Sequence, residues 1–272
     1  RVLTAQKIIR HHMNDKVSVW TTRSRAVAAL DPAFGGNRCI FMVGTIGDTL
    51  FDSAVLEINK VLEILPQAKS ELPADNQIAE RVVAECRAWG VEAEYFGMDT
   101  TGSGRGVAAL LAQNWSSHII RVEFGGSATD EPTAPDDPRP ARVAYGNRVT
   151  QLWFNVATLG LAGKLRGLPQ QAAKEFCSRP YERRGRRLQV IPKERMKELL
   201  GGSPDEADAV SILVEVARRH GIVATLASTK PTTNSWQALA AKADRVWTTD
   251  STAADRVPDE EPALGATPYQ VL

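Results

Sequence analysis

The sequence predicts an α/β protein built on one mixed β-sheet that is flanked by helices. Short apolar runs bounded by glycine, proline and asparagine indicate strands, and apolar patterns of helical period lie between them. Strands that alternate with helices along a chain are typical of a sheet with helical crossovers. The 272 residues, 43% hydrophobic and with a formal net charge of +1, suffice for one large folded domain.

The first half of the chain supplies most of the expected strands. Strands that form an antiparallel meander are expected over residues 25–30, 39–46 and 50–58. Asp75 is predicted to cap a helix that ends at Gly90, because glycine is the usual residue after a helix. Further strands are expected over 91–98 and 118–124, with a helix around 107–111 between them.

The second half is predicted to be mainly helical. Residues 126–143, rich in Pro, Asp and small polar residues, are expected to form a mobile surface loop. Helices should follow around 149–159 and over 169–177, and residues 181–191 indicate a hairpin that turns at Gly185.

The last helix should run from Ser203 to His220. Ser203 is expected as its N-cap, Pro204 at its first position and Glu206 as the partner in a capping box.

These patterns divide the chain into three segments. Residues 1–24 are interpreted as a polar, partly helical lead-in, residues 25–220 as the folded domain, and residues 221–272 as a C-terminal extension that is partly disordered. Three scattered cysteines without metal-binding spacing favour a reducing compartment inside a cell. The sequence contains no run of about 18 apolar residues, so no membrane span is predicted.

Aspartates at the ends of predicted elements give the strongest functional signal. Asp31 and Asp99 each close an apolar strand, where an ordinary turn aspartate is the alternative interpretation. Asp205 and Asp208 share one face of the last helix, and Asp208 is the better ligand candidate because Asp205 also suits the helix N-terminus. Converging carboxylates repel one another unless a cation lies between them, so we expect a site for Mg²⁺ or Mn²⁺.

The densest basic stretch covers the predicted hairpin and the residues after it. The candidate DNA-binding residues in this stretch are Arg183, Arg184, Arg186, Arg187 and Lys193. On a hairpin they would present a positive ridge that can follow phosphates, and a solvated charged loop is the alternative. No base-reading motif accompanies them, so contact would be mainly with the DNA backbone.

Taken in order, the motifs resemble those of one family. ALDPAFGGN, GMDTTGSGRGV, AYGNRVTQLWF and SPDEADAV are similar to motifs of the C-terminal nuclease domain of the large terminase subunit of tailed phages, over roughly residues 25–220. The resemblance implies an RNase H-like fold and a metal-dependent endodeoxyribonuclease that cuts concatemeric viral DNA with two divalent ions. It also implies that Asp31, Asp99 and Asp208 are catalytic metal ligands and that Asp205 is an auxiliary ligand.

The same resemblance implies partners and a location. The partners are double-stranded DNA, an ATPase domain without a counterpart in this sequence, the portal protein and the small terminase subunit, with no membrane. The location is the host cytoplasm, at the procapsid portal. Two alternatives stay open. One is another RNase H-like nuclease, such as a junction resolvase that prefers branched DNA, and the other is a non-catalytic portal or DNA docking module.

Overall fold

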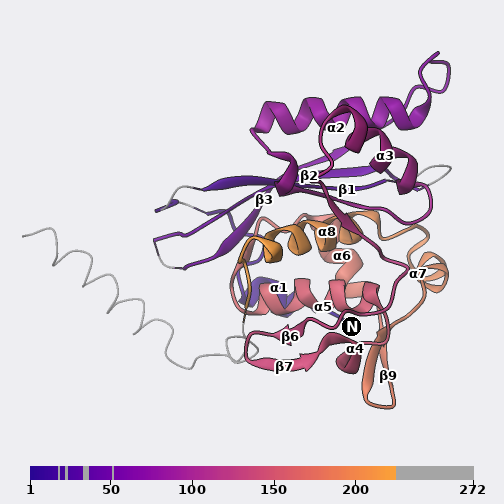
Figure 1. The fold of residues 1–272 in the computed structure, drawn as a ribbon. Coiled ribbons are helices and arrows are strands. Elements are labelled where there is room, and N and C mark those ends of the chain that lie inside the picture. Colours follow the sequence, from indigo (N-terminus) through magenta and orange to yellow (C-terminus); the bar gives the residue numbers. More distant parts are fainter. Residues whose placement is uncertain (18, 22–23, 33–36, 51, 225–272) are drawn as a thin grey trace, which may run out of the picture. The chain divides into compact units, whose positions relative to one another are not determined.

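The computed structural model describes residues 1–17, 19–21, 24–32, 37–50 and 52–224. In this part of the chain, six strands form one mixed sheet with the order β5-β4-β1-β2-β3-β8 (Figure 1). These strands are β1 (Arg25–Asp31), β2 (Ile40–Gly47), β3 (Val55–Glu63), β4 (Phe96–Asp99), β5 (Ile120–Val122) and β8 (Leu165–Arg166). Strands β1 to β3 form the antiparallel meander, and β4 runs parallel to β1. The predicted mixed sheet is therefore confirmed.

Helices and two small hairpins complete the described part of the chain. The helices are α1 (Ala5–Arg10), α2 (Ala74–Trp89), α3 (Gly104–Asn114), α4 (Ala141–Ala144), α5 (Arg148–Leu161), α6 (Gln170–Ser178), α7 (Lys193–Leu200) and α8 (Asp205–Arg219). The hairpins are β6 (Pro132–Ala134) with β7 (Asp137–Pro140), and β9 (Tyr181–Arg184) with β10 (Arg187–Val190). None of the described helices is long and apolar enough to cross a membrane.

Alternation along β1 gives the sheet two apolar faces, because successive side chains of a strand point to opposite sides. Val27 and Ala29 pack into a core with α5, α6 and α8, whereas Ala28 and Leu30 pack into a second core with α2 and α3. Figure 1 shows the sheet between these two groups of helices. Helix α8 packs directly against β1, β2 and β4.

The first thirteen residues also contribute to the folded domain. Val2, Leu3, Ile8 and Met13 are buried in the core that contains α5 and α6. The segment interpreted as a lead-in thus begins with residues that pack as part of the core.

The third strand of the meander differs from its prediction. Strand β3 begins at Val55 rather than at residue 50, because side chains extend the preceding turn. The Asp48 carboxylate accepts the Ala54 N–H at 2.7 Å, and the Thr49 hydroxyl accepts the Asp52 N–H at 2.9 Å. Such side-chain to backbone bonds compete with the strand ladder.

Residues 126–143 are structured, so the prediction of a mobile loop is wrong. They contain the β6–β7 hairpin and the start of helix α4. The Arg139 guanidinium bonds the Asp137 carboxylate at 2.6 Å, and the Thr133 hydroxyl donates to the Arg139 carbonyl at 2.9 Å. The Thr133–Arg139 bond joins the two strands of the hairpin, and the polar composition of the segment does not reveal such a pairing.

Both predicted N-caps are wrong, although the helices themselves are confirmed. Pro73 and Pro204 occupy the N-cap positions of α2 and α8, and the buried Ser203 hydroxyl has no hydrogen-bond partner among the described residues. At α8, the Glu175 carboxylate from α6 accepts the Ala207 N–H at 2.7 Å instead. Burial raises the pKa of Glu175 to about 7.

The other predicted boundaries hold in part. Gly90 ends α2 with φ 67°, the left-handed conformation expected there. Strands β4 and β5 are shorter than predicted, because a 3₁₀ turn (Ala93–Tyr95) occupies the start of the first of them. The predicted disorder from Thr249 onward lies outside the described residues.

Candidate functional site

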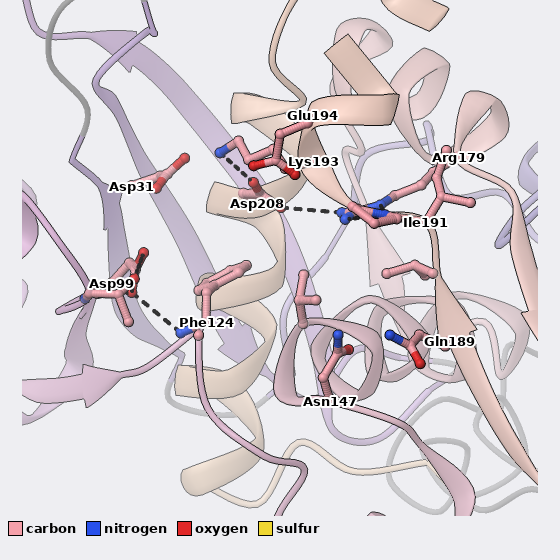
Figure 2. A pocket seen from close by; sticks show the side chains of 15 residues that line it. Asp31, Asp99, Phe124, Asn147, Arg179, Gln189, Ile191, Lys193, Glu194 and Asp208 are labelled. Carbon is pink, nitrogen blue, oxygen red and sulfur yellow. Dashed lines mark hydrogen bonds and ion pairs between the residues drawn. The ribbon is translucent and has the colours of Figure 1, made fainter. Parts of the chain in front are cut away.

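A pocket of about 370 Å³ opens where the ends of β1 and β4 face the first turn of α8. Asp31 ends β1, Asp99 ends β4 and Asp208 lies on α8, and all three line this pocket (Figure 2). The parallel register, with Leu30 opposite Met98, places both strand ends at the same edge of the sheet. Three of the four aspartates singled out in the sequence therefore meet at one pocket.

Asp31 is the least satisfied of the three carboxylates. Its side chain is only 5% exposed, and its Oδ2 atom has no hydrogen-bond partner among the described residues. Burial raises the pKa of Asp31 well above its usual value, and the nearby Asp208 carboxylate raises it further. A buried carboxylate of this kind needs a positive charge beside it in order to stay ionised.

Asp99 is held in one orientation by its neighbours. Its Oδ1 atom accepts the Thr101 N–H at 2.9 Å, the Thr101 hydroxyl at 2.8 Å and the Phe124 N–H at 3.4 Å. Burial raises the pKa of Asp99, and the bonds from Thr101 oppose that effect because they stabilise the charged form. The Asp99 carboxylate is thus aimed into the pocket by the loop that follows its own strand.

Asp208 is the central carboxylate of the site. Its Oδ1 atom accepts the Trp153 indole N–H at 2.9 Å, and its Oδ2 atom lies 3.0 Å from the Lys193 ammonium. The Arg179 guanidinium lies 4.0 Å from Oδ1. Because Trp153 is fully buried in the core, it holds Asp208 in a fixed position.

The Lys193 ammonium lies between two carboxylates of α8. It is 3.0 Å from Asp208 and 3.7 Å from Asp205, and it projects from α7, a helix that the sequence analysis missed. Burial opposes the charge on Lys193, but Asp208 and Asp31 outweigh that effect and raise its pKa. Lys193, predicted as part of a DNA-binding ridge, therefore lies within the acidic site.

Asp205 stands apart from the pocket. It does not line the cavity, and its Oδ2 atom accepts the Arg38 backbone N–H at 2.9 Å. This bond links the start of α8 to the residues that lead into β2.

The donor set fits a hard divalent cation, although no complete cage is formed. Within the described ranges, no group of three or more Asp, Glu, His or Cys side chains is arranged to hold a metal ion. Three carboxylates nevertheless line one pocket, and one of them has a buried oxygen without a hydrogen-bond partner. Oxygen ligands of this kind are those that Mg²⁺ and Mn²⁺ prefer. In this structure the Lys193 ammonium supplies the compensating charge.

Close packing of α3 against the Asp99 loop predicts an effect of one glycine on stability. A Cβ at Gly104 would lie 2.1 Å from the Asp99 carbonyl oxygen. Gly104→Ala should therefore push the loop away and lower the free energy of unfolding, measured in urea, by about 1–3 kcal/mol. A Cβ at Gly202 would meet nothing within 4 Å, so Gly202→Ala is the matched control. Equal effects of the two changes would contradict the prediction.

The predicted basic hairpin is confirmed as β9–β10, with Gly185 at the turn in the left-handed region (φ 61°). Arg184 pairs with Arg187, and both line a groove of about 450 Å³ together with Arg186. Arg183 pairs with Leu188 and does not line this groove, because neighbouring residues of a strand face opposite sides.

Several residues of the pocket were missed by the sequence analysis. These are Thr101, Phe124, Asn147, Arg179, Gln189 and Glu194. Arg179 is almost fully buried, with its guanidinium 4.4 Å from the centre of the Trp153 ring and its N–H groups bonded to the Ile191 carbonyl. In the sequence, Arg179 is one more arginine of a basic stretch, and nothing distinguishes it from its neighbours. Asn147 lies in the AYGN motif, so the motif could have indicated it as a site residue.

The mixed sheet and its flanking helices form an RNase H-like fold. The structure of the chain is similar to that of the nuclease domain of the large terminase subunit gp2 of bacterial virus Sf6, with a TM-score of 0.55 and 14% sequence identity. The similarity covers 78% of this chain and 97% of that domain. A mutant of the same domain, solved with manganese and β-thujaplicinol, gives a TM-score of 0.56 at the same identity and coverage.

The chain therefore has the fold of phage terminase nuclease domains, as the sequence motifs predicted. No family model matches the sequence, and no curated protein matches it.

Proposed function

We propose that this chain is a divalent-metal-dependent endodeoxyribonuclease that cuts concatemeric viral DNA during genome packaging. The observation that carries this proposal is the meeting of Asp31, Asp99 and Asp208 at one pocket. The similarity of fold to terminase nuclease domains supports it. The partners would be double-stranded DNA, an ATPase domain, the portal protein and the small terminase subunit, at the procapsid portal in the host cytoplasm.

In this proposal the aspartates hold the metal ions, and neighbouring side chains fix the orientation of the aspartates. Two bound Mg²⁺ or Mn²⁺ ions would activate a water and stabilise the charge on the leaving oxygen. Asp31, Asp99 and Asp208 would hold these ions, and Asp205, which does not line the pocket, would act as an auxiliary group that shares the Lys193 ammonium with Asp208. Thr101 keeps Asp99 in its orientation, as the buried Trp153 does for Asp208.

DNA would reach the pocket along the arginine groove of the β9–β10 hairpin. Arg184, Arg186 and Arg187 line one groove, and Gln189 belongs to both this groove and the acidic pocket. Three guanidinium groups in one concave surface suit the regular spacing of phosphates. The contacts would be with the backbone, and the cut would then depend weakly on sequence.

The groove predicts which arginines matter for DNA affinity. Arg184→Ala combined with Arg187→Ala should weaken duplex binding and lower the slope of log K against log salt by about 0.9 for each phosphate that is no longer neutralised. Fluorescence anisotropy of a labelled duplex over a salt series measures this slope. Arg183→Ala, on the other face of the same hairpin, should leave the slope almost unchanged. An equal effect of Arg183→Ala would contradict the groove as the DNA path.

Substrate preference tests the proposal against a junction resolvase. Initial cleavage rates should be compared on linear duplex and on a four-way junction of the same sequences. The proposal predicts that the linear duplex is cut at least as fast. A clear preference for the junction would point to resolution of branched DNA instead.

One observation favours a second candidate, a docking module with a silent site. Among the described residues no complete metal cage is formed, and Lys193 already neutralises Asp208. Such a module would bind DNA or the portal without cutting. Folded protein that binds duplex but leaves it intact at every Mg²⁺ and Mn²⁺ concentration would support this candidate.

A further inference from the structure

Two neutral amides, those of Asn147 and Gln189, belong to the wall of the acidic pocket. Asn147 is the N-cap residue just before α5, and Gln189 lies on β10. In Figure 2 both lie on the side of the pocket away from Asp31 and Asp99. Neither amide is needed to hold a metal ion, so their position in the pocket suggests another role.

The orientation of Asn147 is fixed by its role as the N-cap of α5. Its Oδ1 atom accepts the Thr150 N–H at 3.0 Å and the Thr150 hydroxyl at 2.5 Å. The amide oxygen is thus used by the helix, and the amide nitrogen makes no hydrogen bond within the described part of the chain. Asn147 therefore presents two N–H donors on a half-buried side chain at the pocket.

The side chain of Gln189 packs against Gly146, which has no side chain to displace it. A Cβ at Gly146 would lie 2.8 Å from the Gln189 Oε1 atom and 3.2 Å from its Cδ atom, so a larger residue there would displace the Gln189 amide. Gln189 lines both the acidic pocket and the arginine groove. Gly146 lines the groove while the next residue, Asn147, lines the pocket. The two cavities are therefore neighbours at these three residues.

We infer that Asn147 and Gln189 bind the sugar–phosphate backbone of the DNA strand between the cutting pocket and the arginine groove. This inference rests on the proposed nuclease function. Amides can donate hydrogen bonds to phosphate oxygens without adding a positive charge beside the carboxylates. Backbone rather than base contact follows from continuity with the three groove arginines, since contacts to phosphate and sugar set the register of a protein on DNA. The AYGN segment would thus form part of the DNA-binding surface.

The test measures DNA binding in EDTA, so that cleavage plays no part. Gln189→Met keeps the length of the side chain and removes its donors, and Asn147→Ser keeps an N-cap acceptor while it removes the amide. Each change should raise the Kd for a short fluorescein-labelled duplex about five-fold, the usual effect of removing one hydrogen bond. Gly146→Ala should act in the same direction by displacing Gln189. Gln113→Ala, an exposed glutamine on α3, is the matched control.

The outcomes separate this inference from the proposed function. An equal loss of affinity on duplexes of unrelated sequence, with unchanged melting temperatures, supports backbone contact. A loss confined to certain sequences means base readout and overturns the inference, as does wild-type affinity in all three variants. If the wild type cuts DNA and the variants bind normally, only this inference fails. If the wild type neither binds nor cuts DNA, the proposed function fails with it.

Discussion

Replacing Lys193 with alanine is expected to lower the melting temperature of the metal-free protein by roughly 5–10 °C. The Lys193 ammonium lies within 4 Å of Asp208 and Asp205, and both carboxylates are almost fully buried. Loss of one partner from a fully buried ion pair costs about 3–5 kcal/mol. Because the Lys193 side chain stays 35% exposed, we expect about 2–3 kcal/mol here.

The same change should strengthen the response to metal. Without Lys193 the carboxylates repel one another, and a bound divalent cation restores the missing charge. Mn²⁺ should therefore raise the melting temperature of Lys193→Ala more than that of the wild type, through preferential binding to the folded state. Lys197→Ala, exposed on the same helix, is the control and should behave as the wild type. A Lys193→Ala variant that loses stability without a larger response to Mn²⁺ would argue against a cation site.

Asp208→Asn should lower the rate of DNA cleavage by at least about 100-fold, since even residues that only support metal ligands are often worth 10–100-fold. The change keeps an oxygen that can accept the Trp153 N–H, so the packing around the indole is preserved. It removes the charge that a metal ion would need. Initial rates on linear duplex with Mg²⁺ or Mn²⁺ measure the effect.

Two further readouts make this prediction specific. Asp208→Asn should also lose the Mn²⁺-dependent rise in melting temperature, because its amide is a weaker ligand than a carboxylate. Asp15→Asn, at an exposed aspartate outside the pocket, should retain both cleavage and the metal response. Cleavage by Asp208→Asn within a few-fold of the wild-type rate would remove Asp208 from the set of ligands.

Local patterns were enough to predict most of the sheet and the three aspartates of the pocket. A short continuous apolar run predicts β1, and Asp31 follows from its place at the strand end. The same reasoning places Asp99 at the end of β4 and Asp208 one turn into α8. Because β1 and β4 are adjacent and parallel, their C-terminal ends meet at one edge, which is a consequence of topology rather than of exact strand boundaries.

Long-range pairing could not be predicted in the same way. The density of positive charge after residue 180 suggested one exposed ridge, whereas Met196 is buried in the core and α7 turns Lys193 toward the carboxylates. Glu175 replaces Ser203 as the acceptor at the start of α8, although it lies about 30 residues away on α6. Such contacts depend on tertiary packing, which sequence periodicity does not encode.

Cleavage of supercoiled plasmid by this chain tests the central claim most directly. The protein should be incubated with Mg²⁺, with Mn²⁺ and with EDTA, and the products separated on an agarose gel. The proposal predicts nicked and then linear plasmid with either metal, and intact plasmid in EDTA. Folded protein that binds the plasmid but leaves it supercoiled with both metals would contradict the proposed nuclease and favour a docking module.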